Sequence, residues 1–158
     1  MEKKDLKPAG VFKYFEEICQ VPRPSKKEEK MIAYLKAFGA KHNLETKVDE
    51  AGNVLIKKPA TPGKENLQTV VLQSHIDMVC EKNNDVQHDF LTDPIETEID
   101  GEWLKAKGTT LGADNGIGVA TELAILADDS IEHGPLECLF TVDEETGLTG
   151  AFALKEGS

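Results

Sequence analysis

Residues 71–77 read Val71-Leu-Gln-Ser-His75-Ile-Asp77, a run that begins apolar and ends in an imidazole and a carboxylate. Continuous apolar runs of this length are typical of central, buried strands of α/β proteins. Alternate side chains of a strand share a face, so His75 and Asp77 should point the same way. The stretch therefore predicts a buried central strand that delivers polar groups at its carboxyl end.

The segments around this strand predict alternating helices and strands. Ser25 and Glu28, three residues apart, are typical of a capping box at the start of the second helix. Asp100-Gly101 is a strong hairpin signal. The expected elements, in order, are helix 6–19, a helix around 31–38, hairpin 45–49/53–57, strand 69–73, hairpin 96–99/102–105, helix 117–126, strand 136–142 and helix 148–154. This order indicates an α/β fold, a mixed sheet flanked by helices.

Charge and composition narrow the possible partners. The 158 residues include 29 acidic and 18 basic side chains, a net charge of -11, which argues against nucleic acid or anionic membranes as partners. No window approaches the length of a membrane span, and the N-terminus lacks the apolar stretch of a signal peptide. Three widely spaced cysteines (Cys19, Cys80 and Cys138) do not resemble a disulfide framework. We expect a cytoplasmic protein with reduced thiols.

Asp114 lies between glycines, in Gly112-Ala-Asp114-Asn-Gly116, just before the third predicted helix. One interpretation is a helix N-cap, in which Asp114 or Asn115 accepts hydrogen bonds from the free amides of the first turn. The other is a metal ligand, because a carboxylate that bridges two cations uses both of its oxygens. The sequence around Asp114 leaves both interpretations open.

Glu144 and Glu145 end the second predicted buried strand. Adjacent acids are commonly part of a solvated turn. However, ligand sites of open α/β sheets lie at the carboxyl ends of strands, where His75 and Asp77 also fall. One glutamate could then hold a cation while the other removes a proton from water, whose pKa a metal lowers to about 7. The pattern predicts a hydrolytic metal site.

With these residues assembled, the chain resembles the M20 metallopeptidases, and among them the aminoacyl-histidine dipeptidases (Xaa-His dipeptidase, peptidase D). The similarity covers nearly the whole chain and is carried by residues 72–82, 93–95, 107–118 and 140–147. The resemblance implies a zinc-exopeptidase-like fold. It also implies a cis peptide bond between Asp114 and Asn115.

The resemblance implies a co-catalytic pair of divalent ions, zinc or alternatively manganese or cobalt. His75 would bind one ion, Asp114 would bridge both, and Glu145 would bind the second. Glu144 matches the general base, and Asp77 the acid that orients the site of His75. The substrate would be a small dipeptide of the Xaa-His type.

The family pattern also needs a further aspartate and a further histidine beyond these positions, and a lid or dimerisation domain. We therefore expect residues 1–158 to be a truncated, N-terminal part of the catalytic domain of a protein that forms a homodimer. Two alternatives stay open: a related amidohydrolase or deacylase with the same metal core, and a catalytically incompetent fragment that acts only as a folding unit.

Overall fold

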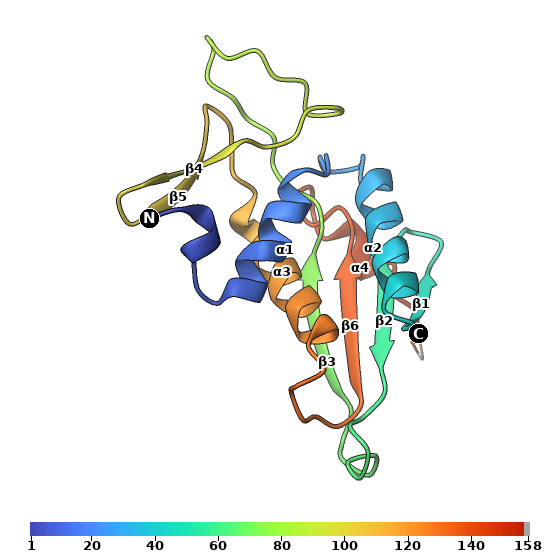
Figure 1. Ribbon diagram of the computed structural model, residues 1–158. Coiled ribbons are helices and arrows are strands. Elements are labelled where there is room, and N and C mark those ends of the chain that lie inside the picture. The colour runs from blue at the N-terminus through green and yellow to red at the C-terminus, as the bar shows by residue number, and fades with distance from the viewer. Residues whose placement is uncertain (157–158) are drawn as a thin grey trace.

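Helices and strands follow one another in the predicted order in the computed structural model of the protein, which describes residues 1–156 (Figure 1). The last two residues of the predicted unit 1–158 lie outside the described part. The elements are η1 Lys3–Asp5, α1 Ala9–Cys19, α2 Glu29–Lys41, β1 Glu45–Val48, β2 Val54–Lys58, β3 Val70–His75, β4 Thr97–Asp100, β5 Trp103–Ala106, α3 Ala113–Ala127, β6 Leu136–Thr141 and α4 Thr149–Phe152.

Within the described residues, the main sheet has the strand order β1-β2-β6-β3. β1 and β2 form the predicted hairpin, β2 runs antiparallel to β6, and β3 runs parallel to β6 with His75 beside Thr141. β4 and β5 form the second predicted hairpin as a separate ribbon. Because β3 and β6 are parallel, the segments that follow them leave the sheet at the same edge.

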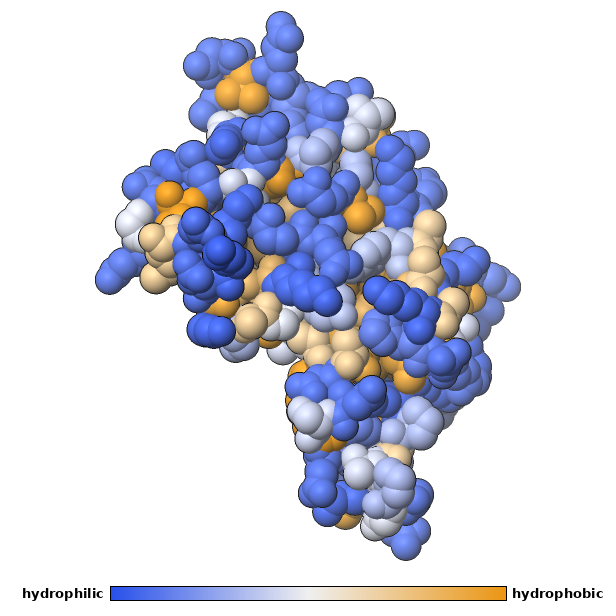
Figure 2. All heavy atoms as spheres, viewed as in Figure 1, coloured by the Kyte–Doolittle hydropathy of each residue, from blue (hydrophilic) through white to orange (hydrophobic). Residues whose placement is uncertain are grey.

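The core lies on the face of the sheet that carries α1, α2 and α3 (Figure 1). Apolar side chains of the helices meet those of the central strands, and the largest of them are fully buried: Phe15, Ile18, Met31, Leu35, Val54, Ile56, Val119, Leu123 and Phe140. Seen from the same side, the outer surface is mostly hydrophilic, with apolar residues in small patches (Figure 2). No helix in residues 1–156 is both long and apolar enough to cross a membrane.

The prediction that β3 is a buried central strand is wrong. In the sheet formed by residues 1–156, β3 lies at the edge and pairs with β6 alone. Val70 and Val71 are 49% and 55% exposed, whereas Ser74 and His75 at its carboxyl end are buried. An apolar run indicates that a strand is able to be buried, but its position in the sheet depends on which strands pair with it.

Two helices begin at positions other than those predicted. α1 starts at Ala9, because Pro8 stands immediately before it with an extended backbone. α3 starts at Ala113, four residues before the predicted 117, and its first turn is interrupted by non-helical dihedral angles at Asp114 and Asn115. The peptide bond between Asp114 and Asn115 is cis, as the resemblance implied.

The predicted capping box of Ser25 and Glu28 is also wrong. α2 begins at Glu29, and Glu28 makes no side-chain capping bond to any described residue. The Ser25 hydroxyl donates instead to Asp77, and the Glu28 carboxylate accepts from the main-chain amide of Asp143. Both side chains serve contacts that are distant in sequence, which a local pattern does not reveal.

A carboxyl group is buried in the core between α3 and the sheet. Glu122 is 4% exposed. Burial raises the pKa of its carboxyl to about 7, and the nearby Ser74 hydroxyl and Cys138 thiol oppose this rise only in part. Glu122 Oε2 and Ser74 Oγ are buried without a well-formed hydrogen bond to any described residue. The folded state therefore favours the protonated form of Glu122.

We predict that Glu122→Gln changes how stability depends on pH. Because the folded pKa of Glu122 is raised, its protonated form stabilises the fold fully below about pH 4.5, and this stability is lost as the pH rises through about 7. The difference in the free energy of unfolding, Glu122→Gln minus wild type, should therefore increase by roughly 3 kcal/mol from pH 4 to pH 8.

Urea unfolding at both pH values measures this change. Glu137→Gln on β6 is the control, because Glu137 is partly exposed and pairs with Lys57. A difference between Glu122→Gln and wild type that stays constant from pH 4 to pH 8 would contradict the prediction.

Candidate metal site

His75 ends β3 with its ring held from one side. Nδ1 lies 3.0 Å from the main-chain oxygen of Asp77 and 3.2 Å from its Oδ1. Since a carbonyl oxygen only accepts hydrogen bonds, Nδ1 carries the proton that binds it. Nε2 lies 3.0 Å from Asp114 Oδ1, to which it donates a hydrogen bond when the ring is protonated. In the neutral ring Nε2 instead presents a free lone pair to the same space. The ring is thus oriented as a ligand imidazole.

Three potential ligand atoms converge at this nitrogen. One nitrogen of His75 and one carboxylate oxygen each of Asp114 and Glu145 all lie within 4.8 Å of one another. They come from the end of β3, the first turn of α3 and the turn that follows β6. Glu144 lies beside them, with Oε2 3.7 Å from His75 Nε2. The structure therefore brings together His75, Asp114, Glu144 and Glu145, the site residues that the sequence predicts in addition to Asp77.

The Asp77 side chain connects the end of β3 to the turn that follows β6. Its side chain is fully buried and accepts hydrogen bonds from Ser25 Oγ at 2.6 Å and from the main-chain amides of Glu144 at 3.0 Å and Glu145 at 3.1 Å. Burial alone would raise the pKa of Asp77, but the hydrogen bonds from His75, Ser25 and the two amides hold it well below its usual range. Asp77 is therefore a buried anion that fixes both His75 and the backbone of the glutamate pair.

Negative charge is crowded around the single imidazole. Burial alone would lower the pKa of His75, yet the hydrogen bonds to Asp77 and Asp114 and the charges of Asp77 and Glu144 raise it to about 9. Burial and the charges of Asp114 and Glu144 raise the pKa of Glu145. Each shift shows that the site favours additional positive charge. One imidazole and several carboxylates are also a donor set that suits divalent metals, so the residues fit such an ion.

Comparison with known proteins places this arrangement in a family. Residues 71–157 match the sequence profile of peptidase family M20/M25/M40. The chain belongs to this family. Peptidases of the family are metal-dependent, which agrees with the cluster of His75, Asp114 and Glu145.

Two relatives resemble this M20 chain over nearly all of its length. The chain is 52% identical to the cytosol non-specific dipeptidase of Escherichia coli over 154 residues, which are 98% of the chain and 32% of that protein. It is 55% identical to the crystal structure of aminoacylhistidine dipeptidase from Vibrio alginolyticus, with a TM-score of 0.96 over 99% of the chain and 32% of that structure.

A more distant structure, aminopeptidase PepT from Bacillus cereus, is 26% identical, with a TM-score of 0.77 over 92% of the chain and 39% of that structure. The M20 chain thus spans about a third of the length of its most similar relatives.

The structure also decides the alternative interpretation of Asp114. Gly112 occupies the N-cap position of α3, and no side-chain capping bond to the described residues forms there. The Asp114 carboxylate faces His75 instead. Glu144 and Glu145 are not a fully solvated turn either, because their side chains are only 34% and 21% exposed.

Sequence reasoning missed the segment that supports the site. Three of its side chains bind close to the clustered residues: Arg23 binds the main chain at Ile76, Ser25 binds Asp77, and Glu28 binds the main chain at Asp143. The signal available for them was Pro22-Arg23-Pro24, since two prolines exclude a regular helix and leave polar side chains free for distant partners.

We predict that Asp77→Ala strongly destabilises the fold. The substitution leaves the partly buried amides of Glu144 and Glu145 without an acceptor and removes the shorter of the two hydrogen bonds of the Ser25 hydroxyl, at a cost of about 3 kcal/mol in the free energy of unfolding. Asp49→Ala is the matched control, because Asp49 also accepts three hydrogen bonds, from Gly52 and Asn53, but its side chain is exposed whereas that of Asp77 is fully buried. Urea denaturation that gives equal losses for both variants would refute the role assigned to Asp77.

Proposed function

We propose that this M20 chain is part of a metal-dependent dipeptidase that hydrolyses the peptide bond of Xaa-His and related dipeptides. The observation that carries the proposal is the cluster of His75, Asp114 and Glu145, formed from three separate segments of the chain. Its similarity to the cytosol non-specific dipeptidase and to the aminoacylhistidine dipeptidase supports the substrate class.

In this proposal His75 would hold one divalent ion, Glu145 would hold a second, and Asp114 would be shared between them. The Asp114 side chain is 85% exposed, so both of its oxygens are open to ligands. The mixed nitrogen and oxygen donors suit zinc, and manganese or cobalt as alternatives. The surplus of carboxylates over imidazoles supports two ions in place of one.

Bound divalent ions supply Lewis acidity, which lowers the pKa of water and polarises a peptide carbonyl. Glu144 is the proposed general base. Its main-chain amide is fixed to Asp77, while its carboxylate is free of hydrogen bonds to the described residues and lies near His75 Nε2. Glu144 would accept the proton of the attacking water and return it to the leaving amine. Asp77 would keep His75 in the tautomer that binds metal.

The chain would form the N-terminal part of the catalytic domain. Its relatives are about three times longer, and the remaining ligands, a lid and a dimerisation surface would come from outside residues 1–158. We propose a homodimer as the state of the complete enzyme. The name of the Escherichia coli relative supports a cytoplasmic location.

A related amidohydrolase or deacylase is not favoured, because the two most informative relatives are dipeptidases. An enzyme that cleaves N-acyl amino acids better than dipeptides would support it. The 158-residue chain alone, with only part of the expected ligand set, should bind metal weakly and turn over little substrate, as a folding unit would.

We predict that Glu144→Gln in the complete enzyme lowers kcat for a dipeptide by roughly 10²- to 10⁴-fold, because a general base is lost. Metal content and KM should stay close to wild type, because Glu144 is not a proposed ligand. Steady-state kinetics with metal analysis tests this. Wild-type kcat, or loss of metal together with activity, would exclude Glu144 as the base.

We predict that His75→Ala abolishes the zinc response of the chain in a titration followed by ¹H–¹⁵N spectra, a method that also detects weak binding. The matched control is His133→Ala, since His133 precedes β6 at the opposite end of the sheet and its ring binds the carbonyl of Gly134. Zinc binding that survives in His75→Ala would remove His75 from the ligand set.

A further inference from the structure

Arg23 is a buried cation in the segment between α1 and α2. We propose that it is a positioning residue that sets the separation between His75 and Asp114. The inference rests on the proposed metal-binding function of that site and adds a residue that touches none of the proposed ligand atoms.

The Arg23 guanidinium joins the two ligand-bearing segments directly. Nη1 donates to the main-chain oxygen of Ile76 at 3.0 Å, and Nη2 donates to that of Gly112 at 2.6 Å. Ile76 follows His75 immediately, and Gly112 stands two residues before Asp114. Because the guanidinium is planar and rigid, these two bonds fix the distance between the two carbonyl groups.

Burial of Arg23 is costly. The residue is 2% exposed, and burial lowers the pKa of its guanidinium although the negative charge of Asp77 opposes this. None of the carboxylates in residues 1–156 forms an ion pair with it, so its bonds to carbonyl oxygens compensate for the lost water. An apolar side chain would fill this volume at a lower cost in desolvation free energy. The presence of an arginine therefore supports a role in holding the geometry of the site.

The main chain at the glycines on both sides of Asp114 packs closely against this guanidinium. A Cβ atom at Gly112 or at Gly116 would lie 2.6 Å from Arg23 Nη2, closer than real Cβ contacts. Gly112 also has φ of +77°, a conformation that favours glycine. The turn that carries Asp114 therefore packs its backbone directly against Arg23.

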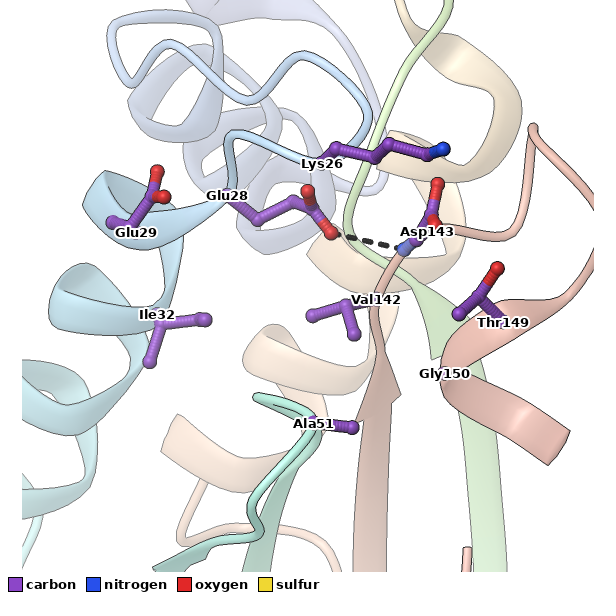
Figure 3. Close-up of a pocket in the computed structure, with 9 residues that line it drawn as sticks. All are labelled: Lys26, Glu28, Glu29, Ile32, Ala51, Val142, Asp143, Thr149 and Gly150. Atoms are coloured by element: carbon purple, nitrogen blue, oxygen red, sulfur yellow. Dashed lines mark hydrogen bonds between the residues drawn. The ribbon is translucent and has the colours of Figure 1, made fainter. Parts of the chain in front are cut away.

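Residues 23–28 also contact the turn after β6 that carries Glu144 and Glu145. Glu28 Oε2 accepts from the main-chain amide of Asp143 at 2.9 Å, next to Glu144, and Figure 3 shows this bond crossing the side of a pocket of about 340 Å³. Together with Ser25 on Asp77, residues 23–28 contact every segment of the site.

Arg23→Met tests the proposal, in the metal-free chain and in a zinc titration, both followed by ¹H–¹⁵N spectra. We expect the zinc Kd to rise by roughly 10- to 100-fold, the usual effect of losing a group that orients ligands. In the metal-free chain, amide signals of both 75–78 and 112–116 should shift.

The matched control is Lys58→Met. Lys58 is also a buried cation that binds main-chain carbonyls, those of Ile125 and Asp128, but it lies at the opposite end of the sheet. Its loss should lower stability and leave the zinc Kd within about twofold of wild type, because it orients no ligand. A zinc Kd that changes equally in both variants would overturn the positioning role.

Gly116→Ala provides a second variant if Arg23→Met does not fold. It keeps Arg23, but its Cβ would displace the guanidinium and would also press on Phe15 and Ile18 at 3.1 and 3.3 Å, so it should weaken zinc binding. Gly10→Ala, whose Cβ meets only Ala124 at 3.6 Å, should not. A wild-type chain that shows no zinc response at all would contradict the metal binding proposed for residues 1–158, and not the positioning role. The metal-free spectra then decide the positioning role, which fails if the signals of 75–78 and 112–116 do not both shift.

Discussion

A single buried carboxylate, that of Asp77, organises the site. It is within hydrogen-bond distance of the His75 ring and accepts from the Ser25 hydroxyl and from the amides of Glu144 and Glu145. His75 and the two glutamate amides meet at Asp77 because β3 and β6 are parallel, with His75 beside Thr141, whereas Ser25 arrives from the segment between α1 and α2. The pairing of β3 with β6 thus brings the two strand ends close together, and the Asp77 carboxylate holds the groups that follow them in place.

The site that results carries more negative charge than its own residues neutralise. His75 is the single imidazole among Asp77, Asp114, Glu144 and Glu145, and its raised pKa reflects that surplus. Buried or crowded carboxylates are stable when a cation or hydrogen-bond donors compensate them. Asp77 has donors, whereas Asp114 and Glu145 point their oxygens toward one common space. This contrast separates the residue that holds the site together from those that we propose as metal ligands.

Much of this could be predicted from sequence, because it depends on local signals. Hydrophobic spacing predicts α2, β2 and β6, and the Asp100-Gly101 turn predicts the β4–β5 hairpin. The location of His75 and Asp77 at a strand end, and of Glu144 and Glu145 at another, predicts that they meet. The structure agrees on each of these placements.

What sequence did not predict depends on distant partners. An apolar run says nothing about which strands flank it, so β3 was expected in the centre of the sheet. The spacing of Ser25 and Glu28 satisfies a capping pattern, but both groups bind residues far along the chain, at Asp77 and Asp143. Pro22-Arg23-Pro24 indicates a segment without regular helix, but it does not reveal the partners of Arg23, because these are carbonyl oxygens that every residue has.

An anomalous difference map from crystals of the protein grown with zinc would show most directly whether His75 and Asp114 bind one metal ion. We expect a zinc peak at coordination distance, about 2.0–2.2 Å, from His75 Nε2 and from a carboxylate oxygen of Asp114. Zinc peaks at other places on the surface, with His75 Nε2 bound only by water or by protein, would contradict it.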